Sequence, residues 1–480
     1  MPKILTKHII LLSCLLTSFI ISGCALNNTK PTPEQVSLSS YSGAYQEKWD
    51  DSNNVFVIER DNKLYFQNIW GITEIDINDE YGFKIDSWNL TAQFSDFENG
   101  KFQRGTGRVD GQSYEFKRIN LDTQNSAFLY EKFGASDFSQ TEKQSCQDNY
   151  SLQSLSENSK NPEKIETLIK QIKSERYGWG EQDSLIIYQD GKLVVEQYFN
   201  GYSRNDPHQI QGVGTSLTSL LVGSLITEGK IADVNAPIVE YLPEYKQLLT
   251  GDKAKITLAN FMDMAAGIEW NEWRVPYTDP ANTRSKEMES DDAVAFVLSL
   301  PMKHEPGKDF SYSGGYVSVV GTVISNLSQQ PTAADYAKNG PLKALCFEDA
   351  YWHKQKDGKT NTAGGGMMRP IDMLKVGQLM LDDGQWQGQQ LIDKQWVADS
   401  RDRTINTYNS KYGYFWLHDD AFVLDNVTNY PYVHASGWGG QEIVIMKELD
   451  LVVVTSASNY DSRGKVNEML RNFIIPAFVD

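Results

Sequence analysis

The chain has 480 residues, 40% of them hydrophobic and 11% aromatic, which is enough apolar material to bury a core in more than one domain. Lysine and arginine total 45 against 63 aspartate and glutamate, so the formal net charge is -18. Because phosphate binding needs basic surface, this balance excludes nucleic acid as the expected partner.

The first 23 residues have the pattern of a bacterial export signal. Lys3 and Lys7 precede an apolar stretch, Ile9 to Ile21, that is too short to span a bilayer comfortably. The residues Ile-Ser-Gly-Cys that end at Cys24 resemble a lipobox, in which cleavage before the cysteine leaves its thiol for a diacylglycerol. We therefore predict that residues 1–23 are a lipoprotein signal peptide and that Cys24 is lipidated and anchors the protein to a membrane.

This signal also predicts the location of the mature protein. Ala25 follows the cysteine, which fits a cell-envelope lipoprotein on the periplasmic face of the outer membrane if the organism is Gram-negative. An ordinary cleaved signal with a chance cysteine is the alternative.

Composition changes along the chain predict two domains and two linkers. Residues 24–40 are polar and serve as a linker from the membrane. From 41 to 130 the chain has short alternating strands, with a hairpin expected at Asp61-Asn62, which indicates a small antiparallel β domain. Residues 131–161 are rich in serine and glutamine and are predicted as a second linker, and 162–480 form the main domain.

The main domain combines strands at both of its ends with a mostly helical middle. Hairpins are expected at Asp190-Gly191 and in the segment EIVIMKELDLVVV, and a closing helix from Lys465 to Ile475. One antiparallel sheet built from the two ends, with helices packed on it, is the simplest arrangement. The predicted fold class is α/β (α+β).

Cysteine and histidine usage leaves little for a metal or cofactor. Once the signal is removed and Cys24 is lipidated, Cys146 and Cys346 remain. An exported location permits a disulfide between them, and two unrelated buried thiols are equally consistent with the sequence. No Cys/His cluster has zinc spacing, so we predict no metal and no cofactor.

A long apolar helix is expected between His208 and Lys230. Leu217, Leu221 and Leu225 recur at helical spacing, and Gly212 and Gly214 mark where the chain enters the helix.

Six segments occur together in the order and spacing of one enzyme family. They are DSLIIYQDGKLVVEQYF, TSLTSLLVGSLITEGKI, ITLANFMDMAAGIEW, HEPGKDFSYSGGY, GGGMMRPIDMLKVGQLMLDDGQW and HASGWGGQEIVIMKELDLVVV. On these segments, from Ser184 to Asn459, the chain resembles the penicillin-binding-protein and class C β-lactamase-like serine hydrolases, including their esterase and 6-aminohexanoate-dimer hydrolase branches. The resemblance implies a β-lactamase/transpeptidase-like domain, an antiparallel sheet flanked by helices.

The first motif of these enzymes is degenerate in this chain. Members of the family attack a carbonyl with the serine of S-x-x-K, and the lysine one turn later helps to remove its proton. The motif falls on Gly212-Val213-Gly214-Thr215, so glycine replaces the nucleophile and threonine replaces the lysine.

The second and third motifs survive in part. Y-x-N falls on Tyr312-Ser313-Gly314, which keeps the tyrosine and has glycine in the third position. K-T-G, one wall of the site in the family, falls on Ala435-Ser436-Gly437. The resemblance implies a binding cleft in which Tyr312 is a relic of the proton relay or a ligand contact, and whose lining is Gly214, Ser313, Ala435, Ser436, Gly437 and Trp438.

The missing groups shape the functional prediction. Loss of the nucleophile costs a serine hydrolase on the order of a million-fold in turnover. We therefore expect a catalytically inactive binding or scaffolding protein, a pseudoenzyme, with a small molecule or a peptidoglycan peptide as ligand. The alternative is an active esterase, amidase or peptidase with a shifted nucleophile such as Ser216.

The replaced motif also raises the hypothesis of an anion site. Backbone N–H groups at the start of a helix, with the hydroxyls of Thr215 and Ser216 beside them, suit a carboxylate. The competing interpretation is that Gly212 and Gly214 simply relax a dead site.

Overall fold

The computed structural model describes residues 31–48, 54–69, 71–86, 89–109, 111–120, 135–139, 150–277, 279–407, 410–424, 427–460 and 465–480. The predicted signal peptide and the lipidation residue Cys24 lie outside these ranges. Within them, each helix is too short or too polar to cross a bilayer.

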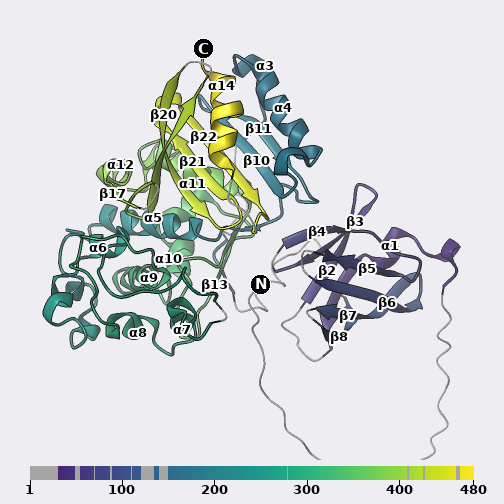
Figure 1. The fold of residues 1–480 in the computed structure, drawn as a ribbon, viewed down its shortest axis with the longest axis horizontal. Coiled ribbons are helices and arrows are strands. Elements are labelled where there is room, and N and C mark those ends of the chain that lie inside the picture. Colours follow the sequence, from purple (N-terminus) through teal and green to yellow (C-terminus); the bar gives the residue numbers. More distant parts are fainter. Residues whose placement is uncertain are drawn as a thin grey trace, which may run out of the picture.

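The N-terminal domain is one eight-stranded antiparallel sheet in the order β4-β3-β2-β1-β8-β7-β6-β5 (Figure 1). Its strands are β1 (Gly43–Glu47), β2 (Asn54–Arg60), β3 (Lys63–Asn68), β4 (Gly71–Ile75), β5 (Gly82–Ile85), β6 (Leu90–Glu98), β7 (Lys101–Val109) and β8 (Gln112–Ile119). Asp61 and Asn62 join β2 to β3 with φ values of 48° and 61°, as a two-residue hairpin turn with both central residues left-handed requires. The predicted antiparallel β domain is confirmed.

The main domain contains a second eight-stranded antiparallel sheet in the order β11-β10-β22-β21-β20-β19-β18-β17. The strands are β10 (Gln182–Gln189), β11 (Lys192–Tyr198), β17 (Ile405–Asn406), β18 (Lys411–Gly413), β19 (Trp416–Val423), β20 (Thr428–Gly437), β21 (Gln441–Met446) and β22 (Leu451–Ala457). The C-terminal strand β22 pairs with β10 along its length, so both ends of the domain build one sheet, as predicted.

Helices cover both faces of this sheet (Figure 1). Apolar residues of α4 (Pro162–Lys173) and of the C-terminal helices α13 (Val466–Met469) and α14 (Ile475–Phe478) pack on one face. Helix α11 (Pro370–Leu381) and helix α5 (Val213–Thr227) contact the other. The remaining helices are α1 (Leu38–Tyr41), α3 (Leu155–Asn158), α6 (Leu258–Met262), α7 (Thr283–Met288), α8 (Ala293–Ser299), α9 (Gly314–Ser328), α10 (Ala333–Asn339) and α12 (Lys394–Asp402).

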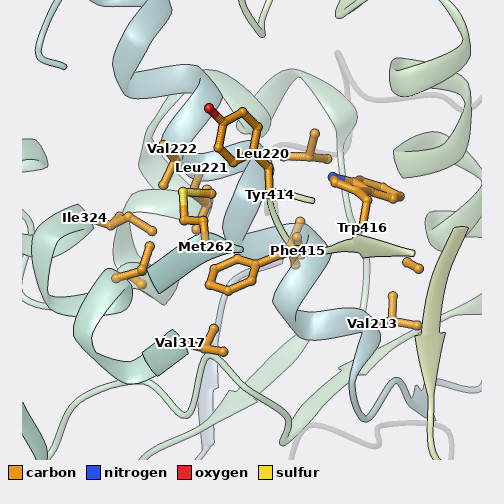
Figure 2. Packing of buried hydrophobic residues seen from close by; sticks show 14 of the residues in the cluster. Val213, Leu220, Leu221, Val222, Met262, Val317, Ile324, Tyr414, Phe415 and Trp416 are labelled. Carbon is orange, nitrogen blue, oxygen red and sulfur yellow. The ribbon is translucent and has the colours of Figure 1, made fainter. Parts of the chain in front are cut away.

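Helix α5 is the centre of the main core. All of its residues except the last two are buried, as expected for a helix that is apolar on every side. Figure 2 shows side chains from its first turns and its middle beside residues of α6, α9 and the β18–β19 turn, namely Val213, Leu220, Leu221, Val222, Met262, Val317, Ile324, Tyr414, Phe415 and Trp416. The position of α5 is therefore set from several directions at once.

The predicted linker 131–161 contains structure, so that interpretation is wrong in part. Ala135–Asp137 forms β9, which pairs with β13 (Tyr351–His353). These strands, with β14 (Gly366–Met368) and β12 (His208–Gln209), make a four-stranded sheet in the order β12-β14-β13-β9. The linker prediction failed because strand pairing over more than 200 residues leaves no local signal in a polar segment.

One of the two cysteines in question is oxidised. Cys346 is disulfide-bonded. Cys146 and the other two cysteines lie outside the described residues.

The β domain docks on the segment that leads into α5. Arg60 donates to both carboxylate oxygens of Asp206, at 2.6 and 2.9 Å, and to the carbonyl of Gly201. The backbone N–H of Ile72 donates to the hydroxyl of Tyr202 at 3.1 Å. These contacts tie strands β2 and β4 to residues just before the degenerate motif.

We predict that Arg60→Ala destabilises the junction between the domains. The Arg60–Asp206 pair is largely shielded from water, with side-chain exposures of 24% and 9%, so its loss leaves a mostly buried carboxylate without its cation. The expected cost is about 2 kcal/mol in the free energy of unfolding, measured by urea denaturation. Lys63→Ala removes the exposed Lys63–Glu74 pair of the same domain, which water screens, and is expected to change the free energy of unfolding far less. Equal effects of the two variants would contradict the prediction.

Candidate active site

The start of α5 meets the end of strand β20 at van der Waals distance. A Cβ atom placed on Gly212 would lie 2.6 Å from the carbonyl oxygen of Ser436, and one on Gly437 would lie 2.4 Å from the carbonyl oxygen of Ile210. Both separations are shorter than carbon and oxygen tolerate, so the backbones approach this closely because both residues are glycines. The nucleophile position therefore has no room for a side chain unless backbone moves.

The lysine position is occupied by neutral hydroxyl groups. Thr215 is buried, and its hydroxyl donates to the carbonyl of Gly212 at 2.8 Å. The phenol of Tyr412 lies beside Thr215, and burial raises the pKa of Tyr412 well above its usual range, with a further increase from the nearby Tyr312. Neither hydroxyl group can replace a lysine as the proton acceptor near neutral pH.

The backbone donors at the start of α5 are already engaged. The N–H groups of Val213, Gly214 and Thr215 donate to the carbonyls three residues before them, at 3.0, 3.1 and 3.0 Å. The hypothesis that this turn binds an anion is therefore wrong for these three donors, because the turn satisfies them internally.

The alternative nucleophile Ser216 faces away from the motif. Its side chain is buried, and its hydroxyl donates to the carbonyl of Phe415 at 2.6 Å. A serine nucleophile needs a base that accepts its proton, and here a backbone carbonyl takes that position.

Residues of the Y-x-N motif lie at the start of α9. Tyr312 is half-buried, and Ser313 caps the helix by accepting the N–H of Tyr316 at 3.2 Å. A Cβ on Gly314 would lie 2.7 Å from Cδ and Nε of Arg284. The buried Arg284 side chain thus fills the space that a third motif side chain would need.

A buried carboxylate lies next to this arginine. Glu272 accepts hydrogen bonds from the N–H of Gly314 at 2.8 Å, the indole of Trp270 at 2.8 Å and the hydroxyl of Tyr277 at 2.9 Å. Burial raises the pKa of Tyr312 above its usual range, the charge of Glu272 raises it further, and Arg284 opposes both effects.

Glu272, Arg284, Trp273 and Tyr277 lie outside the three family motifs, so motif spacing does not point to them. The segment WNEWRVPYTDPANTR, residues 270–284, does carry a signal, because aromatic and charged residues are dense in a loop. That density of residues does not predict that Arg284 of this segment lies beside Gly314.

The third motif forms the end of β20. Ala435 is buried in the core, and the hydroxyl of Ser436 donates to Glu442 at 2.7 Å. Trp438 is 51% exposed, and its indole donates to the carbonyl of Tyr460 at 3.0 Å.

The residues predicted to line the cleft differ in exposure. Trp438 is exposed and Ser436 is half-buried, whereas the positions of Gly214, Ser313, Ala435 and Gly437 are buried. A Cβ on Gly214 would face the carbonyl of Thr362 at 3.4 Å, in the interior. The motif spacing could not reveal these orientations, because they depend on how α5 and β20 pack.

Comparison with known proteins agrees with this geometry. The sequence profile of the beta-lactamase family matches residues 179–472, which is more than half of the chain. The chain belongs to the beta-lactamase family. The resemblance seen in the sequence and the expected β-lactamase/transpeptidase-like fold are both confirmed.

Individual members of the beta-lactamase family are distant relatives. The chain is 24% identical to the 6-aminohexanoate-dimer hydrolase of Paenarthrobacter ureafaciens over 225 residues, 45% of this chain and 56% of that enzyme. It is 23% identical to protein flp of Staphylococcus aureus (strain COL) over 171 residues, 34% of this chain and 33% of flp. The chain therefore spans about half or less of the length of these relatives.

Solved structures of the family share its fold. A Bacillus anthracis protein provisionally assigned as a 6-aminohexanoate-dimer hydrolase superposes with a TM-score of 0.57 at 19% identity, covering 74% of this chain and 94% of that one. A family VIII carboxylesterase superposes with a TM-score of 0.51 at 15% identity, covering 65% and 96%. At these identities the likeness concerns the fold.

We predict that Gly212→Ala destabilises this beta-lactamase family member by about 2 kcal/mol, because the added methyl group meets the Ser436 carbonyl. Chemical denaturation measures the loss. Gly364→Ala is the matched control, since a Cβ there would be 3.9 Å from its nearest neighbour, and it should change stability by less than about 0.5 kcal/mol. If Gly212→Ala left the free energy of unfolding unchanged, the Ser436 carbonyl would have moved away at little cost, and the prediction would be wrong.

A pH-dependent stability is expected from His434. Burial lowers the pKa of His434, but the charge of Glu442 and hydrogen bonds with Asp419 and Glu442 outweigh it and raise the pKa to about 9. The charged imidazole thus stabilises the fold fully below the unfolded pKa of about 6.5, and this contribution is lost as pH rises through about 9.

The loss is expected to be on the order of 2–3 kcal/mol between pH 6 and 10, from urea denaturation at each pH. His434→Gln should remove most of this slope relative to the natural chain. His304→Gln, at a half-exposed site, should leave the slope in place. An unchanged slope in His434→Gln would contradict the assignment.

Proposed function

We propose that this protein is a noncatalytic binding protein of the cell envelope, which uses the fold of a serine hydrolase to hold a small molecule or a peptidoglycan peptide. The main support is the close contact of Gly212 with the Ser436 carbonyl, which leaves no space for a nucleophilic side chain at position 212. Loss of that group costs on the order of a million-fold in turnover, so hydrolysis would be a residual activity at most.

The neighbouring residues support the proposal. Thr215 and Ala435 are neutral where family enzymes carry lysines, and the space beside Gly314 is filled by Arg284. The chain has therefore replaced groups in all three motifs, while Tyr312 and Trp438 stay accessible at the site.

The envelope location rests on the N-terminal sequence. The positively charged start, the apolar stretch and the lipobox-like residues before Cys24 together support export and lipidation. A lipid at Cys24 would hold the β domain and the binding domain at a membrane surface.

The test is covalent labelling followed by intact-mass spectrometry. The chain from Ala25 onward is incubated with a fluorophosphonate, a penicillin and a p-nitrophenyl acyl ester, and we expect no stoichiometric gain of mass. The Paenarthrobacter ureafaciens hydrolase, treated with the fluorophosphonate in parallel, is the positive control for that reagent.

A stoichiometric adduct on the natural chain would refute the noncatalytic role. Peptide mapping would then show whether Ser216 or Tyr312 is the acylated residue, and its substitution by alanine should abolish the adduct.

A further inference from the structure

An exposed group of aromatic rings lies over the buried carboxylate of Glu272. Trp273 is 65% exposed and Tyr277 is 40% exposed, although both carry large apolar rings. The ring of Trp273 contacts that of Tyr312 edge-on, with centroids 5.6 Å apart at 63°. Large exposed aromatic side chains that cluster are characteristic of ligand or partner sites.

Two polar atoms beside these rings point inward. The hydroxyl of Tyr277 and the indole N–H of Trp270 both donate to the Glu272 carboxylate. Because its hydroxyl is engaged, Tyr277 offers a ligand mainly its aromatic surface, and Trp273 adds a second exposed ring. An aromatic face carries negative electrostatic potential, so it attracts a cation.

The charges around the rings favour a cation as well. Glu272 is only 7% exposed and accepts its hydrogen bonds from neutral groups. The nearby Arg284 forms a buried ion pair with Glu287 and also interacts electrostatically with Glu272. Two carboxylates thus face one guanidinium, which leaves one negative charge in excess near Tyr312 and Tyr277. Burial and Glu272 raise the pKa values of both tyrosines, and Arg284 opposes this increase.

The altered motif positions remove the charges that would repel such a ligand. Thr215 and Ala435 are neutral where the family pattern has lysines. Tyr412 lies beside Thr215 and within electrostatic range of Tyr312, so a lysine ammonium at position 215 would repel a second cation bound at Tyr312.

We propose that Trp273, Tyr277 and Tyr312 form a subsite for a substituted ammonium group, with Glu272 as the buried counter-charge. The subsite names the chemical class of one part of the ligand, and it rests on the proposed function in taking the region of the three motifs as a binding site. A carboxylate would be repelled by Glu272, and a neutral apolar group would gain nothing from its charge.

The experiment compares choline with 3,3-dimethylbutan-1-ol, its uncharged isostere, by titration calorimetry on the full chain from Ala25. Choline should bind about tenfold more tightly than the isostere. Trp273→Ala should remove this preference. Phe422→Ala, at an exposed ring paired with the opposite end of β20 from the third motif, should leave it unchanged.

A second variant tests the counter-charge separately. Glu272→Gln should weaken choline binding and leave the isostere unchanged, provided that its melting temperature shows a folded protein. Trp273→Phe tests the aromatic part of the subsite instead and stays informative should Glu272→Gln unfold. It keeps an aromatic face and should retain the preference for choline, and loss of that preference would contradict the subsite.

Equal affinity for choline and the isostere, or no binding of either, would overturn the subsite. The same samples are treated with the fluorophosphonate, so the two proposals fail independently. An adduct would refute the noncatalytic role and leave the choline preference measurable, whereas a lost preference without an adduct would refute the subsite alone.

Discussion

The close approach of two backbones, at the start of α5 and the end of β20, is the constraint on which the site depends. Gly212 lies against the carbonyl of Ser436 and Gly437 against that of Ile210, so each glycine accommodates the other segment. Because α5 is buried along nearly its whole length, neither segment can withdraw without opening the main core. The absence of a side chain at position 212 is therefore built into the packing of the domain.

The buried charges near Tyr312 lie on one loop and the helix that follows it. Thr215 and Ala435 are neutral, and the charged groups are Glu272, Arg284 and Glu287. These side chains are buried, so they persist only because each has hydrogen-bond or ionic partners. Such a satisfied network fixes the loop and presents the rings of Trp273 and Tyr277 to solvent.

Hydrogen bonds also link the β domain to the segment that precedes Gly212. The side chain of Gln209 donates to the carbonyl of Ile69 in the β domain at 3.2 Å, and Gln211 donates in turn to Gln209. Gln211 directly precedes Gly212, with its backbone in the left-handed region at a φ of 48°. The junction between the domains and the first motif therefore share one short hydrogen-bonded segment. A displacement of the β domain would shift the backbone at Gly212.

The sequence by itself determined the features that depend on near neighbours. The hairpins at Asp61-Asn62 and Asp190-Gly191, the apolar helix α5 and the family motifs all follow from local turn chemistry, periodicity and spacing. Only the tertiary structure decided that β9 is a strand, that Ser216 faces Phe415, and that Arg284 fills the space beside Gly314. These outcomes join residues tens to hundreds of positions apart, and the packing of whole elements, which no local pattern encodes, brings them together.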